Sequence, residues 1–350
     1  MRLNHFLVAA SVVAAAACGG GRPAPSIEPP AGPEAMSLLG VPLHASRDTA
    51  GLIAQADAQL AADPDNVTRI INAGIARAAA RRFNSAVEMY TRGIEKYPDE
   101  ARLYRFRGHR YMSLRRFDDA VRDLERAVAL DSTNYDIVYS LALSYYLTQR
   151  YDDAVAAIEK CMEFAENQKW QAVEEARVNP IWYRSCMSLK TDDDARAAMY
   201  DWRYRALRRA GKRTEARRLA RGIREGWTVG DNAPYYRALL FYRGVRDEGS
   251  TLDSLSAAGE LAFVTGAYGV ANWHLVEGDT ARARALFEQI VATDQWPAFG
   301  FIAAEVDLAR MKTPRQTPRA SPAPHPGQAS LRAPARRGHR LTAPSARSPS

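Results

Sequence analysis

The sequence predicts an all-α fold, an α-solenoid of stacked helix pairs, from three observations. The heptamer RRFNSAV at residues 81–87 returns as RRFDDAV at 115–121 and as QRYDDAV at 149–155. Each copy begins 34 residues after the previous one. Small and apolar residues recur within each copy at the spacing of one helix face. A fixed period of this length is typical of repeat proteins, in which each unit stacks on its neighbours.

Three registers, residues 67–100, 101–134 and 135–168, align column by column. Unrelated helix pairs would have to produce this agreement by accident. One column carries tyrosine in the second and third units, where the first unit has Arg77. The signature residues are Gly74, Gly108 and Ala142 in the first small column, Ala86, Ala120 and Ala154 in the second, Tyr111 and Tyr145 between them, and Ala127 and Pro98 further on.

Each unit is predicted to contain two helices, because two separate faces show helical spacing. The small residues Gly108 and Ala120 are placed where the helices cross at the close distance, about 8–10 Å, that packed helices adopt. Asp118 and Asp119 are expected to cap the second helix and to suit its positive N-terminal end. In the second unit the two faces are Tyr104, Gly108 and Tyr111, then Ala120, Leu124 and Ala127.

These residues resemble the tetratricopeptide repeat, a 34-residue helical pair with Gly or Ala, Tyr, Ala and Pro at fixed places. Pro98 occupies the proline column, and Pro64 lies one period earlier. Residues 52–60 are therefore interpreted as the second helix of a preceding half-unit. Residues 46–311 resemble bacterial exported lipoproteins that contain this repeat and have no assigned activity. The resemblance implies a fold and a compartment and no reaction.

The N-terminus predicts export. The apolar run at residues 6–17 is too short to span a bilayer, which takes about 20 residues, and is typical of a signal peptide at 1–17. AAAC at 15–18 resembles a bacterial lipobox, in which Cys18 carries lipid and anchors the protein to a membrane without a spanning helix. Gly19 in place of Asp favours the outer membrane, if the organism has one. Ordinary signal cleavage, giving a soluble periplasmic or secreted protein, remains open.

The rest of the chain divides by composition and by register. The predicted segments are a Pro/Gly-rich tether at 18–45, the half-unit and three regular repeats at 46–168, degenerate helical repeats at 169–312, and a disordered basic tail at 313–350. The register breaks between residues 167 and 190. FGFIAAEVDLARM at 299–311 is expected to be the capping helix that a solenoid needs at its exposed end.

The net charge of +8 comes from the ends of the chain. The tail carries seven arginines and no acidic residue, and Arg2 lies in the leader. Residues 18–312 hold equal numbers of basic and acidic side chains. The predicted folded part is therefore formally neutral, which argues against a nucleic-acid-binding surface.

Motifs of known chemistry are missing from the sequence. There is no Gly-rich phosphate loop, GxSxG elbow, HExxH helix or Cys/His zinc spacing, so we expect no catalytic residue, no metal and no cofactor. His274 is interpreted as a partly buried structural side chain. Cys161 occupies a small-residue column, and its pairing with Cys186 in an exported protein is left open.

The first helices of the units are expected to line a concave groove. The candidate binding residues there are Arg102, Arg105, His109, Tyr139 and Tyr146. Such a surface suits a peptide or helix with an apolar anchor and an acidic group, and ordinary solvated helix faces are the alternative. The clamp by which family members bind chaperone C-termini is not expected, since Ile71 and Ile75 replace its Lys and Asn.

Three functions follow in order of preference. The first is a non-catalytic, membrane-tethered scaffold that binds a protein or peptide partner in the cell envelope. The second is an accessory factor for cell-wall or carbohydrate handling, in which Trp and Tyr of the irregular segments contact sugar. The third is an enzyme with an unrecognised site in residues 167–262.

Overall fold

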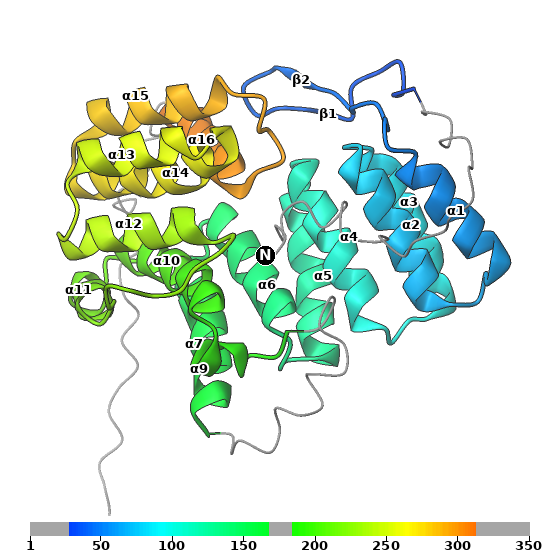
Figure 1. Ribbon diagram of the computed structural model, residues 1–350, viewed down its shortest axis with the longest axis horizontal. Coiled ribbons are helices and arrows are strands. Elements are labelled where there is room, and N and C mark those ends of the chain that lie inside the picture. The colour runs from blue at the N-terminus through cyan, green and yellow to red at the C-terminus, as the bar shows by residue number, and fades with distance from the viewer. Residues whose placement is uncertain (1–27, 168–183, 313–350) are drawn as a thin grey trace, which may run out of the picture. The chain divides into compact units, whose positions relative to one another are not determined.

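The computed structural model describes residues 28–167 and 184–312 (Figure 1). The expected signal peptide, Cys18 and the basic tail lie outside the described residues. The elements are β1 (Ala35–Met36), β2 (Pro42–Leu43), α1 (Leu52–Ala62), α2 (Val67–Ala79), α3 (Phe83–Lys96), α4 (Ala101–Ser113), α5 (Phe117–Leu130), α6 (Tyr135–Leu147), α7 (Tyr151–Asn167), α9 (Ser188–Thr191), α10 (Asp193–Arg209), α11 (Arg213–Arg221), α12 (Ala233–Arg243), α13 (Glu248–Ala257), α14 (Glu260–Glu277), α15 (Thr280–Val291) and α16 (Phe299–Lys312). The predicted all-α class is confirmed.

The helix pairs follow the sequence period. The first helices of the units, α2, α4 and α6, begin 34 residues apart, and so do the second helices, α3, α5 and α7. The residue before each first helix accepts hydrogen bonds from the backbone N–H groups of the first turn, which have no partner inside the helix. These capping residues are Asn66, Glu100 and Asn134.

The small residues lie where the two helices of a unit approach each other. A Cβ added to Gly108 would lie 2.8 Å from Leu124 Cγ and 3.3 Å from the Ala120 carbonyl oxygen. A Cβ on Gly74 would lie 2.3 Å from the Tyr90 ring. Larger side chains at these positions would force the helices apart, because packed interiors have no spare volume.

The expected capping role of Asp118 and Asp119 is wrong. The N-cap residue of α5 is Arg116, whose side chain makes no capping hydrogen bond. The two aspartates lie inside the first turn, and Asp119 forms ion pairs with Arg116 and Arg122. Their charges still suit the positive end of the helix. The three residues between α4 and α5 end with Arg116, so the helix begins before the aspartates are reached.

The predicted tether at 18–45 is wrong for its last part. Strands β1 and β2 form an antiparallel hairpin, with Glu34 N donating to Leu43 O at 2.7 Å. Ser37 Oγ closes the turn by accepting from two backbone N–H groups, and Gly40 adopts a φ of 82°. Leu43 is buried, and the Glu34 side chain binds Asn84 of α3. The hairpin therefore belongs to the folded part.

The second half of the fold continues with less regular pairs. Helix α7 packs against α10, α10 against α12, α12 against α14, and α14 against α15 and α16. Every residue of α16 from 299 to 308 is buried. This differs from the expected capping helix, which would expose a polar face to solvent. As Figure 1 shows, α16 lies behind α14 and α15, which cover it.

A disulfide joins Cys161 of α7 to Cys186, across the break in the register. Both cysteines are buried. The backbone beside Cys186 pairs with the start of α6, where Tyr135 N donates to Arg184 O at 2.7 Å and Cys186 N donates to Thr133 O at 2.8 Å. Residues 184–186 are thus attached to the third unit by covalent and backbone bonds.

Candidate functional site

The inner face of the third unit is filled by the chain itself. Tyr139 and Tyr146, both on α6, are only 8% and 3% exposed. The Tyr139 hydroxyl lies 3.1 Å from the hydroxyl of Tyr235 on α12 and accepts from Trp202 Nε1 of α10, also at 3.1 Å. The Tyr146 hydroxyl lies 2.8 Å from the Tyr268 hydroxyl of α14. The expectation that these two tyrosines face an open groove is therefore wrong.

Tyr139 and Tyr146 are buried because helices of the C-terminal half pack across α6. Burial of the two tyrosines raises the pKa of each hydroxyl, because the ionised form would lose its hydration. Their hydroxyl groups instead satisfy one another and the neighbouring helices, as buried polar groups do. No feature of the 34-residue pattern indicates this cover, since α10, α12 and α14 do not follow the period.

The C-terminal segment also reaches the second unit. His109 of α4 stacks on Phe299 of α16, with ring centroids 4.8 Å apart. Burial and two neighbouring arginines lower the pKa of the His109 imidazole well below its usual value, which keeps it neutral. A neutral ring against an aromatic ring is a packing contact, so this end of the expected groove is closed by α16.

The turns between the two helices of each unit hold the C-terminal segment. Arg81, Arg115 and Gln149 have positive φ values of 54°, 63° and 64° and lie one period apart. Arg81 pairs with Asp294 at 2.9 Å, and Arg115 pairs with Glu305 at 2.5 Å. The Gln149 amide oxygen, oriented to satisfy its hydrogen bonds, accepts from Arg310 Nε at 2.6 Å. One structural position, repeated three times, thus binds residues 294–310.

The Arg115–Glu305 ion pair is the most buried of these contacts. The side chains are 3% and 0% exposed. Arg115 also donates to the carbonyl oxygens of Ser113 at 2.6 Å and Trp296 at 3.1 Å. The backbone N–H of Leu38, in the hairpin turn, donates to Glu305 as well. The hairpin, the second unit and α16 therefore meet at the Glu305 carboxylate. The sequence pattern did not indicate this contact.

Arg102 forms an ion pair at the N-terminal end of its own helix. Its guanidinium donates to both carboxylate oxygens of Glu100, at 2.8 and 2.7 Å. The side chains are 21% and 23% exposed. Glu100 caps α4 at the same time. Arg102 is therefore committed to a local ion pair and is the weaker of the two expected groove arginines.

Arg105 and Arg110 of α4 are half-buried arginines without a counter-charge. Neither side chain forms a hydrogen bond or an ion pair in the described residues. Arg105 lies 4.4 Å from the ring centroid of Phe106, and Arg110 lies 5.1 Å from that of Phe83. The hydroxyl of Tyr90, buried nearby, also lacks a partner. Arg110 was not among the expected groove residues.

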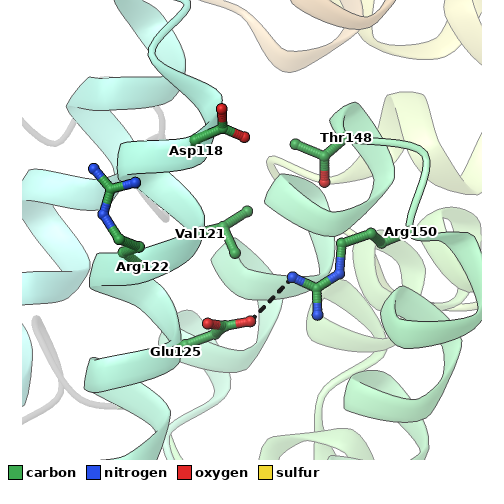
Figure 2. A pocket seen from close by; sticks show the side chains of 6 residues that line it. All are labelled: Asp118, Val121, Arg122, Glu125, Thr148 and Arg150. Carbon is green, nitrogen blue, oxygen red and sulfur yellow. Dashed lines mark hydrogen bonds and ion pairs between the residues drawn. The ribbon is translucent and has the colours of Figure 1, made fainter.

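A shallow pocket of about 270 Å³ lies between α5 and the turn from α6 to α7 (Figure 2). Its basic side chains are already paired. Arg150 binds Glu125 at 3.1 Å and Asp153 at 2.7 Å, and Arg122 binds Asp119. The pocket offers surface polar groups and no arrangement of nucleophile and base. Its residues are Asp118, Val121, Arg122, Glu125, Thr148 and Arg150.

His274 joins three helices. Its Nε2 lies 2.9 Å from Glu248 of α13, and its Nδ1 lies 3.6 Å from Asp279 at the start of α15. Glu248 is bound in addition by Arg282 at 2.6 Å. The interpretation of His274 as a structural side chain agrees with this geometry. In the described ranges no group of three or more His, Cys, Asp or Glu residues is placed to hold a metal, and no helix is long and apolar enough to cross a membrane.

Comparison with known proteins finds a family model that matches part of the repeat region. The model described as tetratricopeptide repeat matches residues 107–161, from α4 into α7. No curated protein matches the chain. Among solved structures, the chain is similar to the MamA protein at 20% identity and a TM-score of 0.36, over 56% of this chain and 85% of that one. It is similar to a tetratricopeptide repeat protein from Parabacteroides merdae ATCC 43184 at 14% identity and a TM-score of 0.39, over 75% and 93%.

Proposed function

We propose that this chain, whose residues 107–161 match the tetratricopeptide-repeat model, is a non-catalytic scaffold that binds a protein partner. The supporting observation is the pair of unpaired arginines on α4, the first helix of the second unit. Stacked helix pairs offer such faces to peptides and helices. Since α10, α12, α14 and α16 fill the inner face of α6, the partner binds further toward the N-terminus, at α2 and α4.

The scaffold function is tested by cross-linked capture from an envelope extract. Arg105→Glu reverses one charge of the proposed surface, and we expect it to lose the principal partner that the wild-type protein retains. Arg92→Glu is the matched control, because Arg92 lies exposed on α3 and forms no ion pair in the described part of the chain. Capture of the same partner by a correctly folded Arg105→Glu protein would show that the surface is misassigned.

We propose further that the scaffold works in the cell envelope, attached by lipid on Cys18. The disulfide between Cys161 and Cys186 supports export, because disulfides persist in oxidising compartments and are rare in the reducing cytosol. Multiple acyl chains on one cysteine would hold the protein firmly at a membrane. The outer membrane is the expected location where the organism has one, and a soluble exported protein is the alternative.

Metabolic labelling with a clickable fatty acid tests the anchor. The wild-type protein should take up label and sediment with membranes, whereas Cys18→Ser should do neither. Cys161→Ser is a suitable control because it changes another cysteine without touching the leader. Label that survives Cys18→Ser, or wild-type protein without label, would leave the soluble alternative.

The carbohydrate-handling alternative has less support. It requires accessible aromatic rings, and the tryptophans of α10, of the segment before α12 and of the segment before α16 are buried. Trp202, Trp227 and Trp296 are 2%, 8% and 4% exposed. Trp170 and Trp182, on which the expectation mainly rested, lie outside the described residues. Sedimentation with purified wall polymer remains its direct test.

A further inference from the structure

Arg105 and Arg110 lack the counter-charges that two neighbouring arginines of the repeats have. Arg77 pairs with Asp57 at 2.7 Å, and Arg107 pairs with Asp123 at 2.7 Å. Removing a guanidinium from water without supplying a counter-charge is unfavourable. Two such groups five residues apart on one helix therefore represent a local cost that the folded chain does not itself offset.

The nearest charges do not compensate them. Among the acidic residues, only the carboxylate of Asp136 acts favourably on Arg105, and Arg184 already binds it at 2.8 Å. Burial lowers the pKa of Arg105, and it lowers that of Arg110 to about 10, with the positive charge of Arg105 acting in the same direction. The two arginines therefore raise each other's electrostatic cost.

The N–H groups of Arg105 and Arg110 remain available to bind a ligand. The Nε atoms of both arginines are buried without a partner. The terminal nitrogens also make no hydrogen bond, yet they are absent from the buried unpartnered atoms, so they reach solvent. The guanidinium carbons of Arg105 and Arg110 lie 4.4 and 5.1 Å from the ring centroids of Phe106 and Phe83. Guanidinium groups that contact an aromatic ring and keep free N–H donors are suited to binding oxyanions.

We propose that Arg105 and Arg110 form an anion subsite that takes a carboxylate from an acidic side chain of the protein partner. This assignment rests on the proposed scaffold function. The Tyr90 hydroxyl, which is buried without a partner, interacts electrostatically with both arginines. A carboxylate is favoured over a phosphate because this partly desolvated site penalises a doubly charged anion more than a singly charged one.

Arginines that form a binding subsite also affect the stability of the protein differently from structural arginines. A structural arginine stabilises the free protein, whereas an uncompensated one lowers stability until its ligand binds. Binding sites often carry such a cost, and removing it raises stability while removing function. The free protein and the ligand-bound protein must therefore respond in opposite directions to the same substitution.

The test is the melting temperature of the full chain with and without hexaglutamate. Binding to the folded part raises it, whereas binding to the basic tail does not. At ten times the dissociation constant we expect a rise of about 2–4 °C for wild type and none with hexaglutamine. Arg105→Gln with Arg110→Gln should abolish the rise and leave the unliganded melting temperature equal or higher. The control is Arg92→Gln with Arg122→Gln, which removes the same charge from exposed positions and should keep the rise.

The other outcomes either overturn the assignment or separate it from the scaffold function. No rise in wild type, or an equal rise in the Arg105 and Arg110 double variant, excludes the subsite. A markedly lower unliganded melting temperature for that variant makes the two arginines structural. A larger rise with a phosphoserine hexapeptide than with hexaglutamate assigns the subsite to phosphate. If hexaglutamate binds as expected while capture yields no partner, the scaffold function fails and the subsite stands.

Discussion

Glu305→Gln is expected to lower the free energy of unfolding by about 3–5 kcal/mol, because it leaves the buried Arg115 without its counter-charge. The amide preserves the shape of the side chain, so the loss reports charge rather than a cavity. The Leu38 N–H and the Arg115 guanidinium would share an uncharged acceptor in place of a carboxylate. Denaturant unfolding of the two proteins measures the difference.

The matched control is Glu225→Gln, which removes a carboxylate from an exposed pair. Glu225 lies 3.4 Å from Arg243, and the side chains are 64% and 31% exposed. Exposed pairs contribute less than about 1 kcal/mol, so this variant should unfold almost as the wild type does. Similar losses for the two variants would mean that α16 does not meet the second unit at a buried carboxylate.

Replacing Cys161 and Cys186 together by alanine is expected to lower the free energy of unfolding by about 3 kcal/mol. The disulfide closes a loop between residues 25 positions apart, and its loss restores the freedom of that loop in the unfolded chain. The same loss should appear in the wild-type protein under reducing conditions. Denaturant unfolding with and without reductant measures both.

The alanine double variant provides the internal control for that experiment, since reductant should not change its stability further. Mass spectrometry of the non-reduced, alkylated wild-type protein gives an independent reading. Alkylation of both Cys161 and Cys186 in the native exported protein would contradict the disulfide and would remove its support for export.

The repeat itself could be read from local signals. The helix starts at Val67, Ala101 and Tyr135 follow from a cap, an apolar face and a turn that lie within one 34-residue unit. The crossing of α4 and α5 at Gly108 likewise depends on residues close in sequence. Such features are properties of short segments, so a single sequence contains them.

The capping error shows where local reasoning stops being sufficient. Asp118 and Asp119 have the residue type of a cap, but the turn places Arg116 at the capping position. The periodic residue that mattered was the one before it, Arg115, whose left-handed backbone conformation aims its side chain at α16. Its equivalents Arg81 and Gln149 are likewise the first residues of their heptamers. The alignment therefore contained this column, but nothing in it indicated that the column binds the C-terminal segment.

The sequence by itself determined the helix pairs, their order and the absence of recognised catalytic motifs, because these depend on spacing and residue type. Tertiary structure alone decided which inner face stays open. The contact between Arg115 and Glu305 joins residues 190 positions apart, and the cover over Tyr139 and Tyr146 comes from helices outside the period. Nothing in a local pattern encodes such a contact, since burial of one face depends on where a distant segment packs.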